Sequence, residues 1–243
     1  ALVSLSIYQS LAFFVTLFLC YKSNWFKLTY LFGKIDKSIA KKFAAFALMA
    51  LVSAICVPLS QMVIRSYLTH EYGSSYAGYW EAMIRLSAAY LMLVTTTLGV
   101  YYLPRLSELS NIQQIKFEIY LGYKYIFPLA VIGGLFVYFL KDWIITLLFT
   151  KSFLPMRDLF FWQMIGDSLK IGSWILAYLM LSKAMTRLFI TTEIIFAITS
   201  ILLTYLCTQI FGFEGVSIAH LINYAVYWIV MSIFIFKSLK EKV

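Results

Sequence analysis

The sequence has few of the residues from which catalytic and metal sites are built. Its 243 residues include only 2 histidines and 3 cysteines, and neither type recurs at a metal-ligand spacing. It also contains no glycine-rich phosphate loop and no Ser/His/Asp arrangement. These absences exclude the common classes of metalloenzyme and hydrolase, so we expect a protein that is not an enzyme.

Long hydrophobic runs, in contrast, are abundant. Hydrophobic residues make up 62% of the chain and its mean hydropathy is +0.84, whereas a soluble domain is nearer half apolar. The runs reach about 18 residues or more, the length that crosses a bilayer as a helix. We therefore predict an all-α, polytopic membrane protein with about seven transmembrane helices. The predicted spans are 1–21, 43–64, 77–103, 125–148, 156–181, 189–210 and 216–236.

The basic residues lie mainly between these runs. Lysine and arginine exceed the acidic residues by 20 to 11, which gives a net charge of +9. In a soluble chain this excess would suggest nucleic acid, but alternate connectors of a membrane protein carry such an excess on the cytoplasmic side. We therefore expect no nucleic-acid partner. The distribution predicts an outer start at residue 1 and a cytoplasmic C-terminus.

The first connector, 22–42, mixes lysines with aromatic and aliphatic residues. That composition suits a cytoplasmic linker lying on an anionic membrane surface, although a solvated loop explains it equally well. Residue 1 is an alanine already inside an apolar run, with no initiator methionine before it. We expect the chain to be the C-terminal part of a longer one.

Two of the predicted spans carry a pair of charges, near the middle of the fifth span and in the outer part of the third. Asp167 and Lys170 are spaced i, i+3, so they share a helix face and can partly neutralise each other, yet each costs roughly 2.5–3.5 kcal/mol at the centre of a membrane helix. Glu81 and Arg85 are spaced i, i+4 in the third span. At about 1.5 Å per residue, Arg85 and Asp167 lie at similar depths, so we expect the four charges to converge in one layer. Three uncharged residues can join them: Gln163, Ser168 and Asn223.

This polar layer has two interpretations. It can consist of structural ion pairs between helices, or it can form the wall of a hydrated cavity that offers cations and hydrogen-bond donors to an anionic cargo. On the second interpretation the predicted substrate-binding residues are Arg85, Asp167, Lys170, Glu81, Gln163 and Asn223. We predict that Glu193 and Arg187 anchor the inner membrane interface and that His220 is a satisfied core residue. No cofactor is predicted; Asp167 or Glu81 could bind protons or sodium, but the spacing does not establish coupling.

Several stretches of the chain resemble a known transporter family. The stretches are Met156-Arg157-Asp158-Leu159-Phe160, Trp162-Gln163, Gly166-Asp167, Leu169-Lys170 with Gly172, Ser182-Lys183-Ala184, and Tyr102-Leu103-Pro104. They resemble the Wzx-type flippases of the multidrug/oligosaccharidyl-lipid/polysaccharide exporter superfamily, with most likeness to the lipid III flippases of enterobacterial common antigen synthesis. The likeness extends from about Lys42 to the C-terminus.

The resemblance implies two helix bundles that open alternately to either side of the membrane. Residues 1–21 would be the last helix of a truncated first bundle, 22–42 the linker and 43–243 the second, six-helix bundle. The implied cargo is an undecaprenyl-diphosphate-linked oligosaccharide, flipped across the bacterial inner membrane. Glu81 and Arg85 depart from the lipid III pattern, which has uncharged residues there, so the resemblance indicates an O-antigen or related unit. Implied partners are membrane lipids, the N-terminal bundle, and polymerase and chain-length proteins of the pathway.

Other functions remain open at this stage. A cation-coupled drug exporter of the same superfamily would share the fold, but its cavity should be net acidic. A membrane glycosyltransferase or polymerase should show large loops with paired carboxylates or histidines, whereas these connectors are short.

Overall fold

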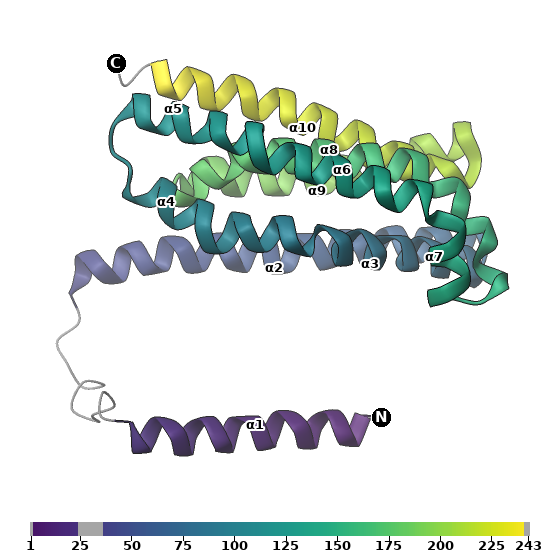
Figure 1. Cartoon of the computed structure of the whole chain (residues 1–243), viewed down its shortest axis with the longest axis horizontal. Coiled ribbons are helices and arrows are strands. Elements are labelled where there is room, and N and C mark those ends of the chain that lie inside the picture. Colours follow the sequence, from purple (N-terminus) through teal and green to yellow (C-terminus); the bar gives the residue numbers. More distant parts are fainter. Residues whose placement is uncertain (1, 24–35, 241–243) are drawn as a thin grey trace. The chain divides into compact units, whose positions relative to one another are not determined.

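The computed structural model describes residues 2–23 and 36–240, and every regular element within these ranges is a helix (Figure 1). This confirms the predicted all-α class. The chain divides into two compact units, Ala1–Phe43 and Ala44–Val243, which are described separately. The division lies close to the predicted start of the second bundle, but the roles assigned to 1–21, 22–42 and 43–243 remain predictions.

The first unit contains one long helix, α1 (Leu2–Lys22). Its side chains from Ile7 onward are almost all exposed within the unit, and they include Phe13, Phe14 and Phe18. A helix that is apolar on all sides needs lipid or another protein segment around it. Most of the predicted basic linker, 24–35, lies outside the described residues.

The second unit is a bundle of long helices with shorter helical segments at their ends and junctions. In chain order its elements are α2 (Lys37–Tyr72, which begins in the first unit), α3 (Ser74–Thr97), η2 (Leu98–Tyr102), α4 (Leu103–Glu108), α5 (Ile112–Leu121), η3 (Gly122–Ile126), α6 (Phe127–Phe139), α7 (Lys141–Leu148), η4 (Lys151–Leu159), α8 (Phe160–Ser182), α9 (Thr186–Phe211), η5 (Gly212–Glu214) and α10 (Gly215–Lys240).

Within the described residues, five helical segments are long and apolar enough to cross a membrane. They are Lys37–Tyr72, Ser74–Glu108, Ile112–Phe139, Lys151–Ser182 and Thr186–Lys237. The last segment is 52 residues long and includes the turn at Gly212–Glu214, which separates α9 from α10. A shorter apolar helix is Ile7–Lys22 of α1.

The predicted fourth span, 125–148, has wrong boundaries. The helical segment starts earlier, at Ile112, where the Asn111 side chain caps α5 by accepting a hydrogen bond from a backbone N–H. It ends at Phe139, because Leu140 leaves the helical conformation (φ −94°, ψ 7°) and the polar pair Lys141-Asp142 follows. The residues after Leu140 form the separate helix α7, which lies across the end of the bundle (Figure 1).

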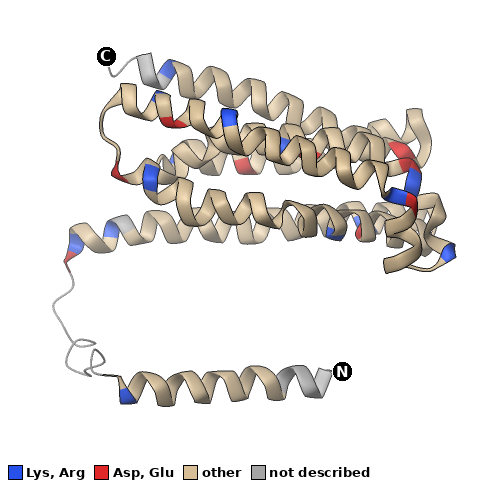
Figure 2. Cartoon of the chain, in the orientation of Figure 1, with Lys and Arg blue, Asp and Glu red and all other residues tan. Residues whose placement is uncertain are grey.

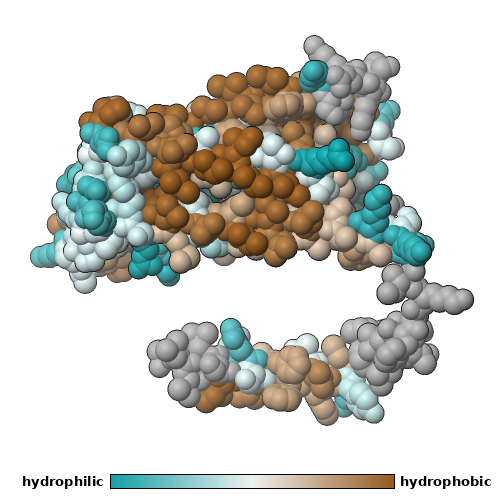
Figure 3. Space-filling view, turned by 180° about the vertical axis from the view of Figure 1, so that it is seen from behind, coloured by the Kyte–Doolittle hydropathy of each residue, from teal (hydrophilic) through white to brown (hydrophobic). Residues whose placement is uncertain are grey.

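The surface of the second unit has the polarity expected of a membrane protein. Its charged residues gather mainly toward the two ends of the bundle (Figure 2). Between the ends, hydrophobic side chains cover most of the face seen in Figure 3. The long helices run between these ends, so the bundle axis crosses the hydrocarbon layer.

The connections between helices alternate between the two ends, as predicted. At one end, the Lys183 ammonium after α8 donates to the Leu109 carbonyl between α4 and α5. At the other end, the Tyr72 and Tyr76 rings at the α2–α3 corner pack on Phe213 in the α9–α10 turn. Which end faces the cytoplasm remains a prediction.

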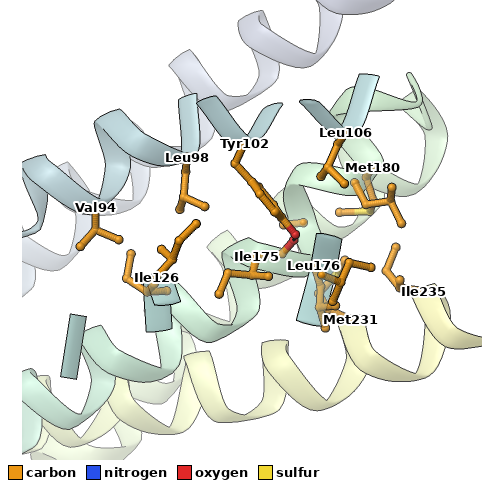
Figure 4. Close-up of a cluster of buried hydrophobic side chains, with 14 of the residues drawn as sticks. Val94, Leu98, Tyr102, Leu106, Ile126, Ile175, Leu176, Met180, Met231 and Ile235 are labelled. Atoms are coloured by element: carbon orange, nitrogen blue, oxygen red, sulfur yellow. The ribbon is translucent and has the colours of Figure 1, made fainter. Parts of the chain in front are cut away.

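One buried cluster holds α3, α4, α8 and α10 together (Figure 4). Tyr102 is 1% exposed, and its hydroxyl donates to the Ile175 carbonyl at 3.2 Å. Leu176, Met180 and Met231 pack around this contact. In a bilayer such contacts act mainly through close packing, because lipid tails are as apolar as the side chains.

Candidate functional site

A polar cavity lies inside the second unit, between α2, α3, α8, α9 and α10. Its volume is about 370 Å³, within the ~300–1,000 Å³ range of small-molecule sites. The polar side chains that line it are Ser60, Gln61, Ser87, Gln163, Asp167, Lys170, Glu193, Ser200, Thr204, His220, Asn223, Tyr224 and Tyr227. We call this space the polar cavity.

Asp167 is the most completely enclosed charged group of the cavity wall. Its side chain is 0% exposed and has three hydrogen-bond partners on three helices. The Tyr90 hydroxyl donates to Oδ2 at 3.0 Å, and the Gln163 amide donates to Oδ1 at 3.3 Å. Nε2 of His220 lies 3.0 Å from Oδ1. An ionised carboxylate only accepts, so Nε2 is then the nitrogen that carries the proton.

Small residues allow these side chains to meet. Gly166 precedes Asp167 in α8, and a Cβ atom at this glycine would lie 2.5 Å from Cδ2 of His220 and 3.1 Å from the Leu221 backbone. Only a residue without a side chain therefore lets α10 approach α8 this closely. On the other side, Gly133 of α6 lies against the Tyr90 ring.

Gln163 extends the network one helical turn away from Asp167. Its amide nitrogen also lies 3.3 Å from the Ser87 hydroxyl, and its amide oxygen accepts from Ser217 at 3.4 Å. Gln163 is buried, so these bonds satisfy polar groups that would otherwise be costly. The network connects α3, α8 and α10.

Lys170 lines the polar cavity, but it is not joined to Asp167 by an ion pair in the described part of the chain. Its ammonium instead lies 4.8 Å from the centre of the Trp174 ring and 5.6 Å from that of Tyr224. These are cation–π distances, and such contacts gain strength where water is excluded. Asp167 and Lys170 are thus neighbours on α8 whose direct partners differ.

Glu81 and Arg85 do not join this group. The Arg85 guanidinium pairs with Glu81 one turn earlier at 2.9 Å, its side chain is 76% exposed, and neither residue lines the polar cavity. The expectation that Arg85 meets Asp167 is therefore wrong. Ser87 and Tyr90 of α3 face α8. Arg85 is two residues before Ser87, a rotation of about 200° around the helix, so it lies on nearly the opposite side of α3.

The remaining predicted residues have mixed positions. Asn223 lines the polar cavity and accepts a hydrogen bond from the Thr199 hydroxyl at 2.8 Å. Ser168 donates within α8 to the Met164 carbonyl and is not a lining residue. That the predicted residues bind a substrate remains a prediction.

Sequence reasoning misplaced one other residue. Glu193, predicted as an interface anchor, lines the polar cavity, while Arg187 is exposed in the first turn of α9. His220 is largely buried (17% exposed) and hydrogen-bonded as predicted, but it also lines the cavity.

A helical spacing could have identified these residues. On α10 the lining residues recur at i, i+3, i+4 and i+7, and on α9 at i, i+4, i+7 and i+11. The α10 stripe consists of His220, Asn223, Tyr224 and Tyr227, and the α9 stripe of Glu193, Ala197, Ser200 and Thr204. On α8 the spacing i, i+4, i+7 and i+11 joins Gln163, Asp167, Lys170 and Trp174 in the same way. No comparable signal points to Tyr90.

Among residues 2–23 and 36–240, no group of three or more histidine, cysteine or acidic side chains is arranged to hold a metal ion.

Sequence comparison relates the chain to known transport proteins. It is 30% identical over 228 residues to the lipid III flippases of Escherichia coli (strain K12) and Shigella flexneri. The alignment covers 94% of this chain and 55% of each flippase. The chain is homologous to the lipid III flippases. It spans about half the length of these curated relatives, and the predicted flippase resemblance is confirmed over that half. No protein-family model matches the chain.

The fold has a counterpart among solved structures. The Vibrio cholerae MATE transporter VcmN, in its bent form, superposes with a TM-score of 0.68 at 15% sequence identity. The superposition covers 83% of this chain and 47% of VcmN. At this identity the likeness shows the fold alone, a MATE-like helical arrangement over part of a transporter. The named relatives of both comparisons are transporters and not enzymes.

Proposed function

We propose that this chain is part of a flippase that moves an undecaprenyl-diphosphate-linked oligosaccharide across the bacterial inner membrane. The observation that carries the proposal is the polar cavity, found between apolar helices in a chain homologous to lipid III flippases. Sugars and a diphosphate cannot cross about 30 Å of hydrocarbon unaided, because their polar groups would lose their hydrogen bonds to water. A hydrated cavity removes most of that cost while the prenyl tail stays in lipid.

The proposed architecture has about seven transmembrane helices. Six of them, α2, α3–α4, α5–α6, α8, α9 and α10, form the second bundle of a two-bundle exporter, with α1 as the last helix of the first. The two bundles open alternately to the cytoplasm and the periplasm. The MATE-like fold and the alternation of connections support this arrangement.

The finer identity of the cargo belongs to the same proposal. The proposed cargo is an O-antigen or related surface-polysaccharide unit. This choice rests on the departure of Glu81 and Arg85 from the lipid III pattern, since neither residue lines the polar cavity. The partners of this chain would be the lipid-linked oligosaccharide, membrane lipids, the first bundle of a full-length flippase, and polymerase and chain-length proteins. The C-terminus would be cytoplasmic.

Genetic complementation tests the proposed function. A full-length flippase containing this chain is expressed in a strain that lacks its own flippase, and lipid-linked intermediates are identified by mass spectrometry. We expect surface polysaccharide to return and the accumulated intermediate to fall. A well-expressed protein that leaves both unchanged would contradict flipping of that cargo.

One observation favours a second candidate, the cation-coupled drug exporter. Two acidic residues, Asp167 and Glu193, line the polar cavity together with one lysine and one histidine, and carboxylates attract cationic substrates. Transport of lipophilic cations by the same full-length protein, measured in vesicles, separates the two. The sequence similarity to flippases over most of the chain favours the first candidate.

A further inference from the structure

The polar cavity is poorly suited to bind an anion. No arginine is among the described residues that line it, and its acids match its basic groups in number. Both basic groups are already engaged, His220 by Asp167 and Lys170 by the Trp174 and Tyr224 rings. A diphosphate placed here would also meet the Glu193 carboxylate, and like charges at short range repel.

The same wall offers what a sugar ring needs. Trp174 and Tyr224 present aromatic surface beside the Lys170 ammonium. The C–H faces of pyranose rings pack on aromatic rings, and their hydroxyls hydrogen-bond to ammonium, amide and carboxylate groups. Asn223 supplies an amide that Thr199 holds in place, and Glu193 supplies an acceptor. A pocket with aromatic walls and a few placed polar groups is the usual form of a small-molecule site.

We propose that the polar cavity is a sugar subsite, in which an uncharged or amino-bearing ring of the cargo packs against Trp174 and Tyr224 beside the Lys170 ammonium. The diphosphate of the cargo binds outside this cavity. Glu193 disfavours a uronate ring here. This inference rests on the proposed function, because it names the part of a lipid-linked oligosaccharide that this half of the transporter recognises.

Binding of two lipids to the purified full-length protein tests the subsite. The probes are undecaprenyl diphosphate carrying a neutral oligosaccharide and undecaprenyl diphosphate without sugar. We expect Trp174→Ala to weaken binding of the glycolipid about two- to twelvefold, the range that aromatic contact energies give, and to leave the sugar-free lipid unchanged. Trp174→Phe keeps an aromatic ring, so it should lower the logarithm of the glycolipid affinity by about half as much as Trp174→Ala does.

Trp143→Ala is the matched control, because Trp143 is 61% exposed on α7 and does not line the cavity. It should leave the affinity for both lipids unchanged. If the Trp174 variants weaken binding of both lipids equally, the cavity binds the diphosphate. If they weaken binding of neither lipid, the cavity does not contact the bound cargo. Either result would contradict the sugar subsite and leave the proposed function intact. A wild-type protein that binds neither lipid would overturn the proposed function together with the subsite.

Discussion

At the scale of single residues, Asp167 is a fully buried carboxylate held by several hydrogen bonds. Its carboxylate has no exposed surface and accepts from Tyr90, Gln163 and His220. A carboxylate can satisfy three donors at once, whereas an amide at the same place contributes donors of its own. The identity of this residue is therefore tied to the hydrogen-bond network as well as to its charge.

We predict that Asp167→Asn lowers both stability and function. The amide nitrogen of asparagine would face at least one donor, and an unpaired buried polar group costs about 1–3 kcal/mol. The melting temperature of the purified full-length protein should fall, and surface polysaccharide in the complemented strain should decrease at matched protein level.

Arg85→Gln is the control for this prediction. Arg85 is exposed, and within the described ranges its ion pair is with Glu81 of the same helix. An exposed pair contributes roughly 0.2–1 kcal/mol. Its effect on the melting temperature should be the smaller of the two. A larger loss from Arg85→Gln than from Asp167→Asn would contradict the central position given to Asp167.

At the scale of helices, the close contact between α8 and α10 brings together two walls of the polar cavity. Gly166 and Gly172 both lie on the side of α8 that meets α10: their Cβ atoms would lie 2.5 Å from His220 and 3.0 Å from the Trp228 ring. These two glycines let α10 come near enough for His220 to reach Asp167. In a membrane, small residues at helix contacts are a general means of close packing.

We predict that Gly166→Ala separates α10 from α8. The added methyl group must displace the His220 ring and meets the Leu221 backbone at 3.1 Å, and overpacking of this kind costs about 1–3 kcal/mol. The expected result is a lower melting temperature together with weaker glycolipid binding.

Gly78→Ala in α3 is the matched control, since a Cβ atom there meets nothing within 4 Å. Alanine is the better helix former by roughly 1 kcal/mol, so this variant should be as stable as the wild type or more stable. Equal tolerance of both substitutions would show that α8 and α10 can move apart without loss.

At the scale of the whole molecule, the alternation of polar ends gives a prediction of orientation. The α8–α9 turn carries Lys183, and Arg187 follows in the first turn of α9, whereas the turn between α9 and α10 carries Glu214 and no basic residue. Positively charged connectors stay in the cytoplasm. The α9–α10 turn should therefore face the periplasm.

Phosphatase fusions to the full-length protein check this orientation. Alkaline phosphatase folds only in the periplasm, so a fusion after Gly212 should be active and a fusion at the C-terminus inactive. A fluorescent protein at the C-terminus should give the opposite pattern. Activity at the C-terminus with none at Gly212 would invert the assignment and place the basic connectors outside.

The sequence by itself determined the class of this protein. Hydropathy is a property of consecutive residues, so apolar runs identify membrane helices without knowledge of their neighbours. For the same reason Asp167 and Lys170 stood out, since a charge inside an apolar run is visible in one dimension. The boundaries near Leu140 were missed because apolar residues resume directly after Lys141-Asp142, while the changed backbone angles of Leu140 end the helix.

Only the tertiary structure decided which polar groups meet. Depth along their helices placed Arg85 and Asp167 at one level. Contact also requires that the two side chains lie on the helix faces that meet. The face of α3 that meets α8 carries Ser87 and Tyr90, not Arg85. The approach of His220 depends on the absent side chain of Gly166 in a different helix. Rotation and separation of helices arise from packing between segments distant in the chain, so no local pattern in the sequence records them.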